Sequence, residues 1–174
     1  MDPMEKAQQG MGKLEKAITG LPGVEGYRAK ELRRDADKQV REGLARRLED
    51  ERRRLTDFQG QLLSNGGLLG MDAMERAGTR LQTLIDRIRT ASYGYAGFFD
   101  LQKVREGELD RLAAFDKALF DQLGPLDEAM KTLGQAVTAN EGLKEAIQGV
   151  ANLLAKMTDD FGHRAEAMQA AEQQ

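Results

Sequence analysis

From residue 27 to residue 123, charged and apolar residues follow one another at the three- and four-residue spacing of an amphipathic helix. This tract contains no proline. Because a proline in a helix interior costs about 3 kcal/mol, the tract can stay helical over its whole length. The chain can reverse at Ser64-Asn65-Gly66-Gly67. The pattern predicts an all-α fold built on a long antiparallel helical hairpin over 27–123, with arms over 27–63 and 72–123 and a turn at about 64–71.

The two arms carry apolar seams of unequal quality. The second arm has two seven-residue repeats of the coiled-coil kind, namely Met74, Leu81, Ile88, Tyr95 and Ala77, Leu84, Ala91, Phe98. In the first arm, Glu51 stands where the stripe requires an apolar residue. Antiparallel pairing should place opposite each other residues whose numbers add up to about 135. Residues beyond about 108 would then overhang the hairpin and need a partner, either the C-terminal segments or another copy.

A separate amphipathic helix is predicted over residues 1–21. Asp2 can cap it, Pro3 suits its first turn, and Gly20-Leu21-Pro22-Gly23 ends it. Its apolar stripe consists of Met4, Ala7, Met11, Leu14, Ile18 and Leu21.

The remaining residues, 125–174, predict acidic C-terminal helices. Gly124-Pro125 indicates a strong helix break, because glycine ends helices and proline begins them. Asn140 offers another cap, yet the apolar spacing almost continues across it. Whether one helix or two follow Pro125 is therefore open.

Composition narrows the class of protein. The 174 residues include 5% aromatic and 32% charged residues, no cysteine and one histidine, which suits thin helical seams better than a thick globular core. The local net charges of residues 1–26, 27–63, 64–124 and 125–174 are −1, +3, −1 and −4, so a basic early helix could attract an acidic tail. The alternative is that these charges are solvated helix faces. With no signal-like leader and no long apolar run, we expect a cytoplasmic protein, able to lie peripherally at the inner face of a membrane.

The residues needed for familiar catalytic and metal chemistry are missing from the sequence. Cysteine ligands are absent, and His163 has neither a second histidine nor a glutamate at the spacing of a di-iron bundle. The glycines of Gly66-Gly67-Leu68-Leu69-Gly70 lack the lysine of a phosphate loop. We therefore predict no enzymatic activity, no cofactor, no metal and no small-molecule substrate.

The order of elements resembles the PspA/ESCRT-III superfamily of membrane-remodelling polymers. The resemblance covers an amphipathic segment over Met4–Leu21, a hairpin over 27–123 and acidic C-terminal helices. It implies a protein that self-assembles through its hairpin and binds and remodels a membrane surface. The run from Leu84 to Asp100 is also similar to bacterial all-helical proteins, a likeness that suggests no function.

The candidate membrane-binding residues follow from the first segment itself. A short helix with lysines beside an apolar face can lie in the headgroup layer of an anionic membrane. The residues in these roles are Met4, Met11, Leu14 and Ile18 with Lys6, Lys13 and Lys16. Packing of this helix onto the hairpin is the competing interpretation.

A different set of residues would serve the other functions. These functions are self-assembly into a homo-oligomer or polymer, and docking of a protein partner by a soluble coiled-coil adaptor. Four of the nine aromatic residues lie within Tyr93–Phe99, as either a recognition patch or a thick core layer. The candidates are Arg46, Arg47, Arg53, Arg54, Tyr93, Tyr95, Phe98, Phe99, Phe115 and Phe120. Nucleic-acid binding is disfavoured, because eight acids interleave with the eleven bases of residues 27–63.

Overall fold

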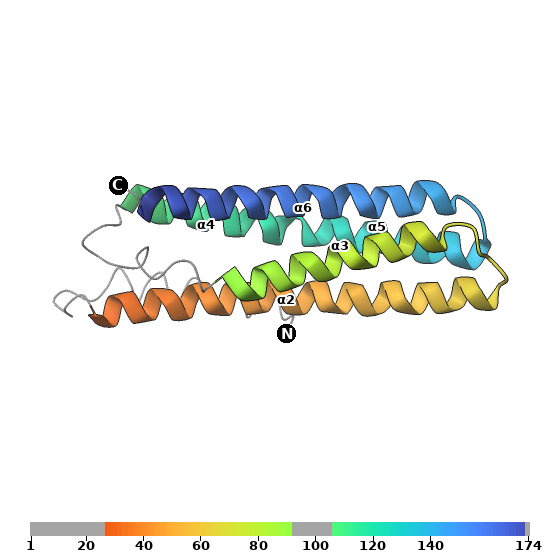
Figure 1. Ribbon diagram of the computed structural model, residues 1–174, viewed down its shortest axis with the longest axis horizontal. Coiled ribbons are helices and arrows are strands. Elements are labelled where there is room, and N and C mark those ends of the chain that lie inside the picture. The colour runs from red at the N-terminus through yellow and green to blue at the C-terminus, as the bar shows by residue number, and fades with distance from the viewer. Residues whose placement is uncertain (1–26, 92–105, 173–174) are drawn as a thin grey trace.

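The computed structural model describes residues 27–91 and 106–172, and all of its elements in these ranges are helices. Helix α2 spans Tyr27–Ser64, α3 Met71–Thr90, α4 Glu106–Asp121, α5 Leu123–Ala139 and α6 Leu143–Glu172. The predicted all-α class is confirmed. So are the first arm of the hairpin and its turn, because α2 and α3 pack side by side and the chain reverses between Ser64 and Met71 (Figure 1). The ion pair between Glu49 and Arg89, at 2.8 Å, lies close to the expected pairing register.

The helices form a bundle of four parallel and antiparallel rods, in which α4 and α5 lie end to end and make up one rod (Figure 1). Helix α2 packs on α3 and α5, and α6 packs on α3, α4 and α5. Figure 1 shows that α2, α4 and α5 run in one direction and that α3 and α6 run in the other. The chain thus forms two hairpins, one of α2 and α3 and one of α4, α5 and α6. Each hairpin buries its apolar face against the other.

One hydrophobic core runs through all five helices. It contains the heptad positions of α3 and the apolar stripes of α2, α5 and α6, including Leu48, Leu81, Leu133 and Leu154, with Leu119 from α4. Glu51, the predicted defect in the stripe of α2, is partly buried at the edge of this core.

The prediction of one continuous helix over 72–123 is wrong. Helix α3 ends at Thr90, and α4 runs back in the opposite direction against α6 (Figure 1). Residues beyond 108 therefore do not overhang the hairpin. Their partner is α6, one of the two partners expected for them. The local pattern could not show this, because the same apolar spacing suits a straight continuation and a returning helix.

The helix breaks after residue 121 also differ from expectation. Gly124-Pro125 is not a strong break: α5 already begins at Leu123, and Gln122 keeps helical angles of φ −81° and ψ −14°. Pro125 lies in the first turn of α5, where a missing N–H costs little. The reversal comes instead at Asn140 and Gly142, both with positive φ, so two separate helices follow Pro125. At the start of α3, Gly70 holds the N-cap position and no side chain caps the helix.

Candidate functional site

Three exposed leucines gather at one end of the bundle, in and beside the turn between α2 and α3. Among the described residues these are the exposed large hydrophobic side chains: Leu63 is 54%, Leu68 74% and Leu69 88% exposed. We call Leu63, Leu68 and Leu69 the leucine tip. Scattered single apolar residues are ordinary on protein surfaces, whereas a group of them marks a contact site.

The backbone of the turn is held in place while the leucine side chains project. The Gly67 N–H donates to the Leu62 carbonyl at 2.9 Å, and the Met71 N–H donates to the Leu68 carbonyl at 3.3 Å. Gly70 has φ +96°, and a Cβ added to it would lie 3.0 Å from Leu143 Cδ2 in α6. Glycine is therefore required here both by backbone conformation and by close packing. The turn is anchored on the start of α6.

Charged residues at this end of the bundle belong to α3, to α6 and to the turn between α5 and α6. Asp72, Glu75 and Arg76 are exposed on the first two turns of α3, and Lys144 is exposed in the first turn of α6. Glu141 and Glu145 line an open groove between α5 and α6.

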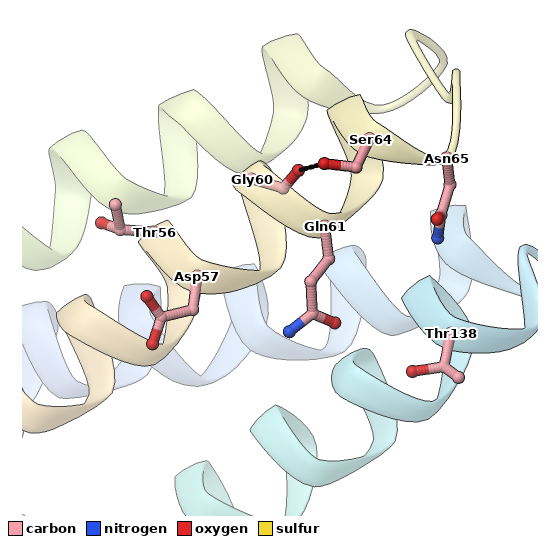
Figure 2. A pocket seen from close by; sticks show the side chains of 7 residues that line it. All are labelled: Thr56, Asp57, Gly60, Gln61, Ser64, Asn65 and Thr138. Atoms are coloured by element: carbon pink, nitrogen blue, oxygen red, sulfur yellow. Dashed lines mark hydrogen bonds between the residues drawn. The ribbon is translucent and has the colours of Figure 1, made fainter.

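An open groove of about 750 Å³ lies beside this end, between α2 and α5 (Figure 2). It is lined by Thr56, Asp57, Gly60, Gln61, Ser64, Asn65 and Thr138. Figure 2 shows the Ser64 hydroxyl donating to the carbonyl of Gly60, at 2.9 Å. The hydroxyls of Thr56 and Thr138 likewise donate to carbonyls one turn earlier in their own helices. A hydroxyl nucleophile needs a base within hydrogen-bond reach. The lining contains one carboxylate, Asp57, and no histidine, so the groove has hydrogen-bonding groups but no histidine base beside them.

At the opposite end, a buried ion pair joins α4 to α6. Arg164 Nε donates to Asp116 Oδ1 at 2.6 Å, and Arg164 is 1% exposed. The guanidinium carbons of Arg87 and Arg164 both lie within 6 Å of the centroid of the Phe161 ring. This pair is not among the predicted site residues. The sequence does contain a signal for this pair, because both residues stand at inward-facing positions of an apolar stripe. Asp116 lies three residues before Leu119, and Arg164 lies three residues after Phe161.

Arg41 is a second buried arginine among the described residues, and it binds the end of α3. Its Nη1 donates to the carbonyls of Ile88 at 3.2 Å and Arg89 at 3.3 Å. Carbonyls in the last turn of a helix have no partner within that helix, so the guanidinium replaces missing hydrogen bonds. Arg41 therefore has a structural role at the hairpin.

Gln122 and Asp160 bind each other at the junction of α4 and α5. Gln122 Nε2 donates to Asp160 Oδ2 at 2.6 Å, and Lys156 Nζ lies 2.8 Å from the same oxygen. The bond from Lys156, followed by the one from Gln122, holds the pKa of Asp160 below its usual value, although burial opposes this. These contacts fasten the junction to α6.

Of the four candidate arginines, Arg54 turns toward a neighbouring helix. Its Nη1 lies 2.6 Å from Asp127 in α5 and 2.8 Å from Glu51. Burial raises the pKa of the Glu51 carboxyl, and the nearby Arg54 charge opposes the rise. Bonds from Lys131 and Arg54 lower the pKa of Asp127. Arg54 thus joins α2 to α5.

The other candidate arginines lie on the outer face of α2. Arg46, Arg47 and Arg53 are exposed, and Arg46 and Arg53 form ion pairs with acids of the same helix. Pairs of this kind are worth about 0.3–0.5 kcal/mol. These arginines remain accessible to a partner.

The aromatic candidates do not form one patch among the described residues. Phe115 and Phe120 of α4 are half-buried, and Phe120 packs on the core beside Gly43. Tyr93, Tyr95, Phe98 and Phe99 lie outside the described residues, as do the membrane-binding candidates Met4, Lys6, Met11, Lys13, Leu14, Lys16 and Ile18.

Sequence reasoning missed the leucine tip. Leu68 and Leu69 belong to a glycine-rich turn that lacks the lysine of a phosphate loop, and the motif itself predicts no role for them. The available signal was two adjacent leucines enclosed by glycines, at a point where the helical pattern stops. Turns are usually built from polar residues, so apolar residues there need a reason.

No protein-family model matches this chain, and neither a curated protein nor a solved structure matches it. Within residues 27–91 and 106–172, no group of three His, Asp or Glu side chains is placed to hold a metal ion. None of the helices in those ranges has the length and apolar character needed to cross a membrane. The described residues define an all-α helical bundle with three exposed leucines at one end.

Proposed function

We propose that this protein is a non-enzymatic binding protein that docks a protein partner through its leucine tip. The observation that carries the proposal is the gathering of the exposed large hydrophobic side chains of the described residues at one end of the bundle. Fully burying a leucine side chain is worth about 1.5–3 kcal/mol. Scaled by their exposed fractions of 54%, 74% and 88%, the three leucines together offer on the order of 3–6 kcal/mol of binding free energy. A contact of that size can anchor an interface around it.

The use of the buried charged groups supports the non-enzymatic part of the proposal. In the described ranges, Arg41 binds the end of α3, and Asp116 and Arg164 join α4 to α6. Strongly perturbed groups inside an open cleft would indicate catalysis. Here these buried groups lie between packed helices.

Membrane-surface binding by an ESCRT-III-like polymer is the second candidate function. The observation that favours it is the lysine-flanked apolar stripe over Met4–Ile18. A further reason for this candidate was the expected overhang of residues beyond about 108, which would need a partner. In the structure, α6 packs on these residues. We therefore place partner docking first.

Retention of proteins on the immobilised full chain tests the first candidate. Wild type should retain a partner from a lysate of the source organism that Leu68→Ser/Leu69→Ser does not retain. The purified partner should then bind wild type and fail to bind the variant. Thr79→Ser/Thr83→Ser, on the exposed face of α3, is the matched control and should behave as wild type. Identical retention by all three proteins would contradict docking through the leucine tip.

Liposome co-sedimentation tests the second candidate. Met11→Glu/Ile18→Glu should lose binding to anionic vesicles that wild type retains. Sedimentation velocity over a range of concentrations and salt should accompany it, because a polymer would exceed the 19.3 kDa of a monomer. Equal partitioning of both proteins, together with uniformly monomeric material at low salt, would remove this candidate.

A further inference from the structure

Asn65 and Gly66 form an asparagine–glycine pair in the turn between α2 and α3, and both residues are exposed. Asn65 follows Ser64, the last residue of α2, and Gly66 has φ +74°. A Cβ added to Gly66 would meet nothing within 4 Å, so the main chain is open at this point. The pair therefore combines a side-chain amide with a following main-chain nitrogen that no side chain shields.

Two hydrogen bonds restrain this pair. Asn65 Nδ2 donates to the Val137 carbonyl of α5 at 3.4 Å, and Figure 2 shows the Asn65 side chain pointing from the end of α2 toward α5. This distance is longer than the usual ~2.9–3.0 Å of an N–H···O bond, so the restraint is weak. The Gly66 N–H donates to the Leu63 carbonyl at 3.0 Å, at the C-terminal end of α2, where a helix opens most readily. When both bonds open, the amide carbon of Asn65 can turn toward the nitrogen of Gly66.

We propose that Asn65 is a site of spontaneous deamidation, which converts its amide to a carboxylate and loosens the turn between α2 and α3 from α5. The reaction needs water and neither an enzyme nor a cofactor. It is independent of the docking proposed for the leucine tip, although the same turn continues to Leu68 and Leu69.

The reaction is a ring closure followed by hydrolysis. The main-chain nitrogen of Gly66 gives up its proton to water or hydroxide and attacks Cγ of Asn65. The new N–Cγ bond forms, the Cγ–Nδ2 bond breaks, and Nδ2 takes up a proton and leaves as ammonia. Water then opens the cyclic imide at either of its carbonyls, which gives aspartate or its β-linked isomer, isoaspartate. One amide and one water become one carboxylic acid and one ammonia, with no oxidation or reduction.

The chain holds two other asparagines, and neither is followed by glycine. Asn140 precedes Glu141, whose side chain crowds the attacking nitrogen. Asn152 lies inside α6, where the next N–H is held by the helix. Asn65 should therefore react faster than either of them.

The product places a new charge at two helix ends. Asn65 follows α2 and Val137 lies in the last turn of α5, so a carboxylate at position 65 faces the C-terminal ends of both helices. The partial negative charge of a helix C-terminus disfavours an anion beside it. A carboxylate also cannot donate to the Val137 carbonyl, so this attachment of the turn to α5 is lost. In isoaspartate, the main chain of the turn is longer by one methylene group as well.

Incubation of the full chain at mildly alkaline pH, followed by peptide mass spectrometry, tests the reaction. Asn140 and Asn152 serve as controls within the same molecule. We expect Asn65 to convert at least about tenfold faster than either of them, a difference of ~1.4 kcal/mol in activation free energy. Asn65→Gln keeps an amide on a side chain that is longer by one methylene group, which disfavours the ring, and it should stay unconverted. A synthetic peptide of residues 61–70 is the positive control for the chemistry.

The matched variants Asn65→Asp and Asn152→Asp test the structural consequence. Asn65→Asp should lower Tm by about 1–4 °C, because it adds a charge at two helix ends and removes a donor. Asn152 is exposed within α6 and accepts from Gln148 Nε2 at 2.7 Å, a role that a carboxylate keeps. Asn152→Asp should therefore melt close to wild type.

Each contrary result overturns a stated part of the inference. If Asn65 stays intact while the peptide converts, the folded turn prevents ring closure. Equal conversion of all three asparagines would show that the pair in the turn has no special reactivity. If Asn65→Asp melts as Asn152→Asp does, deamidation leaves the attachment to α5 unchanged.

Discussion

The buried pair of Asp116 and Arg164 holds α4 against α6, and removing one partner should be costly. Arg164 is 1% exposed and the Asp116 side chain is 10% exposed, with 2.6 Å between Nε and Oδ1. A buried charge that loses its counter-charge costs about 3–5 kcal/mol, whereas replacement of both charges by apolar groups is often neutral or stabilising. We therefore expect Asp116→Leu and Arg164→Met each to lower the free energy of unfolding by about 3–5 kcal/mol. The double variant should stay within about 1 kcal/mol of wild type.

Thermal and urea denaturation, followed by circular dichroism, measure these differences. For a chain of this size 1 kcal/mol shifts Tm by about 2–4 °C, so each single variant should melt on the order of 10 °C lower. The matched control is the exposed pair of Asp50 and Arg53, at 3.1 Å, under the same substitutions. Exposed pairs are worth about 0–1 kcal/mol, and the control variants should therefore melt close to wild type.

One result would contradict a buried ion pair between α4 and α6. If Asp116→Leu costs no more than Asp50→Leu, the Asp116 carboxylate is solvated and α4 is not packed on α6 as described. The return of the chain through α4 would then lose its main polar support.

Three further predictions concern particular side chains. Glu51→Leu should raise Tm by a few degrees, because an apolar residue suits the stripe of α2. Wild type should lose stability as the pH rises through the raised pKa of Glu51, and the variant should not show this loss. The pKa of Asp160 in the folded protein is lowered from its ordinary value of 3.8, so the ionised carboxylate adds stability above pH 3.8. That stability is lost as the pH falls through the lowered pKa. In acid titration, the stability of Asp160→Asn should therefore fall less steeply than that of wild type. Gly70→Ala should cost about 1–3 kcal/mol, because φ is +96° and α6 lies against the site. Gly60→Ala, with open space around it, should instead stabilise by up to about 1 kcal/mol in thermal melts; equal effects of the two alanines would contradict the assigned backbone.

Local sequence patterns predicted the first helix of this hairpin, the start of the second and the turn between them. Periodic leucines over 27–63 and the repeats after residue 71 predicted two packed faces, and the glycines at 66 and 67 placed the reversal between them. The structure buries these faces and turns the chain there. Local patterns decide such features because hydrogen bonding within a helix, apolar spacing and turn residues act over a few residues.

The apolar stripe also revealed its own defect in advance. Glu51 interrupts the leucines of α2, and the structure partly buries it, raises its pKa and places Arg54 beside it. The partner in α5, Asp127, belongs to a segment far away in the chain, and nothing in the spacing of α2 indicates it. The fault was therefore visible in the sequence, and its compensation only in the structure.

The direction of the chain after residue 90 was decided by tertiary packing alone. The predicted second arm would have continued to residue 123, but α4 returns and buries its apolar side, with Asp116, against α6. Likewise, Pro125 is tolerated near the start of α5, whereas Asn140 ends that helix. An apolar stripe specifies that a face must be buried and not which distant face covers it. For the same reason the sequence showed leucines in a turn, and only the assembled bundle showed that no described neighbour covers Leu68 and Leu69.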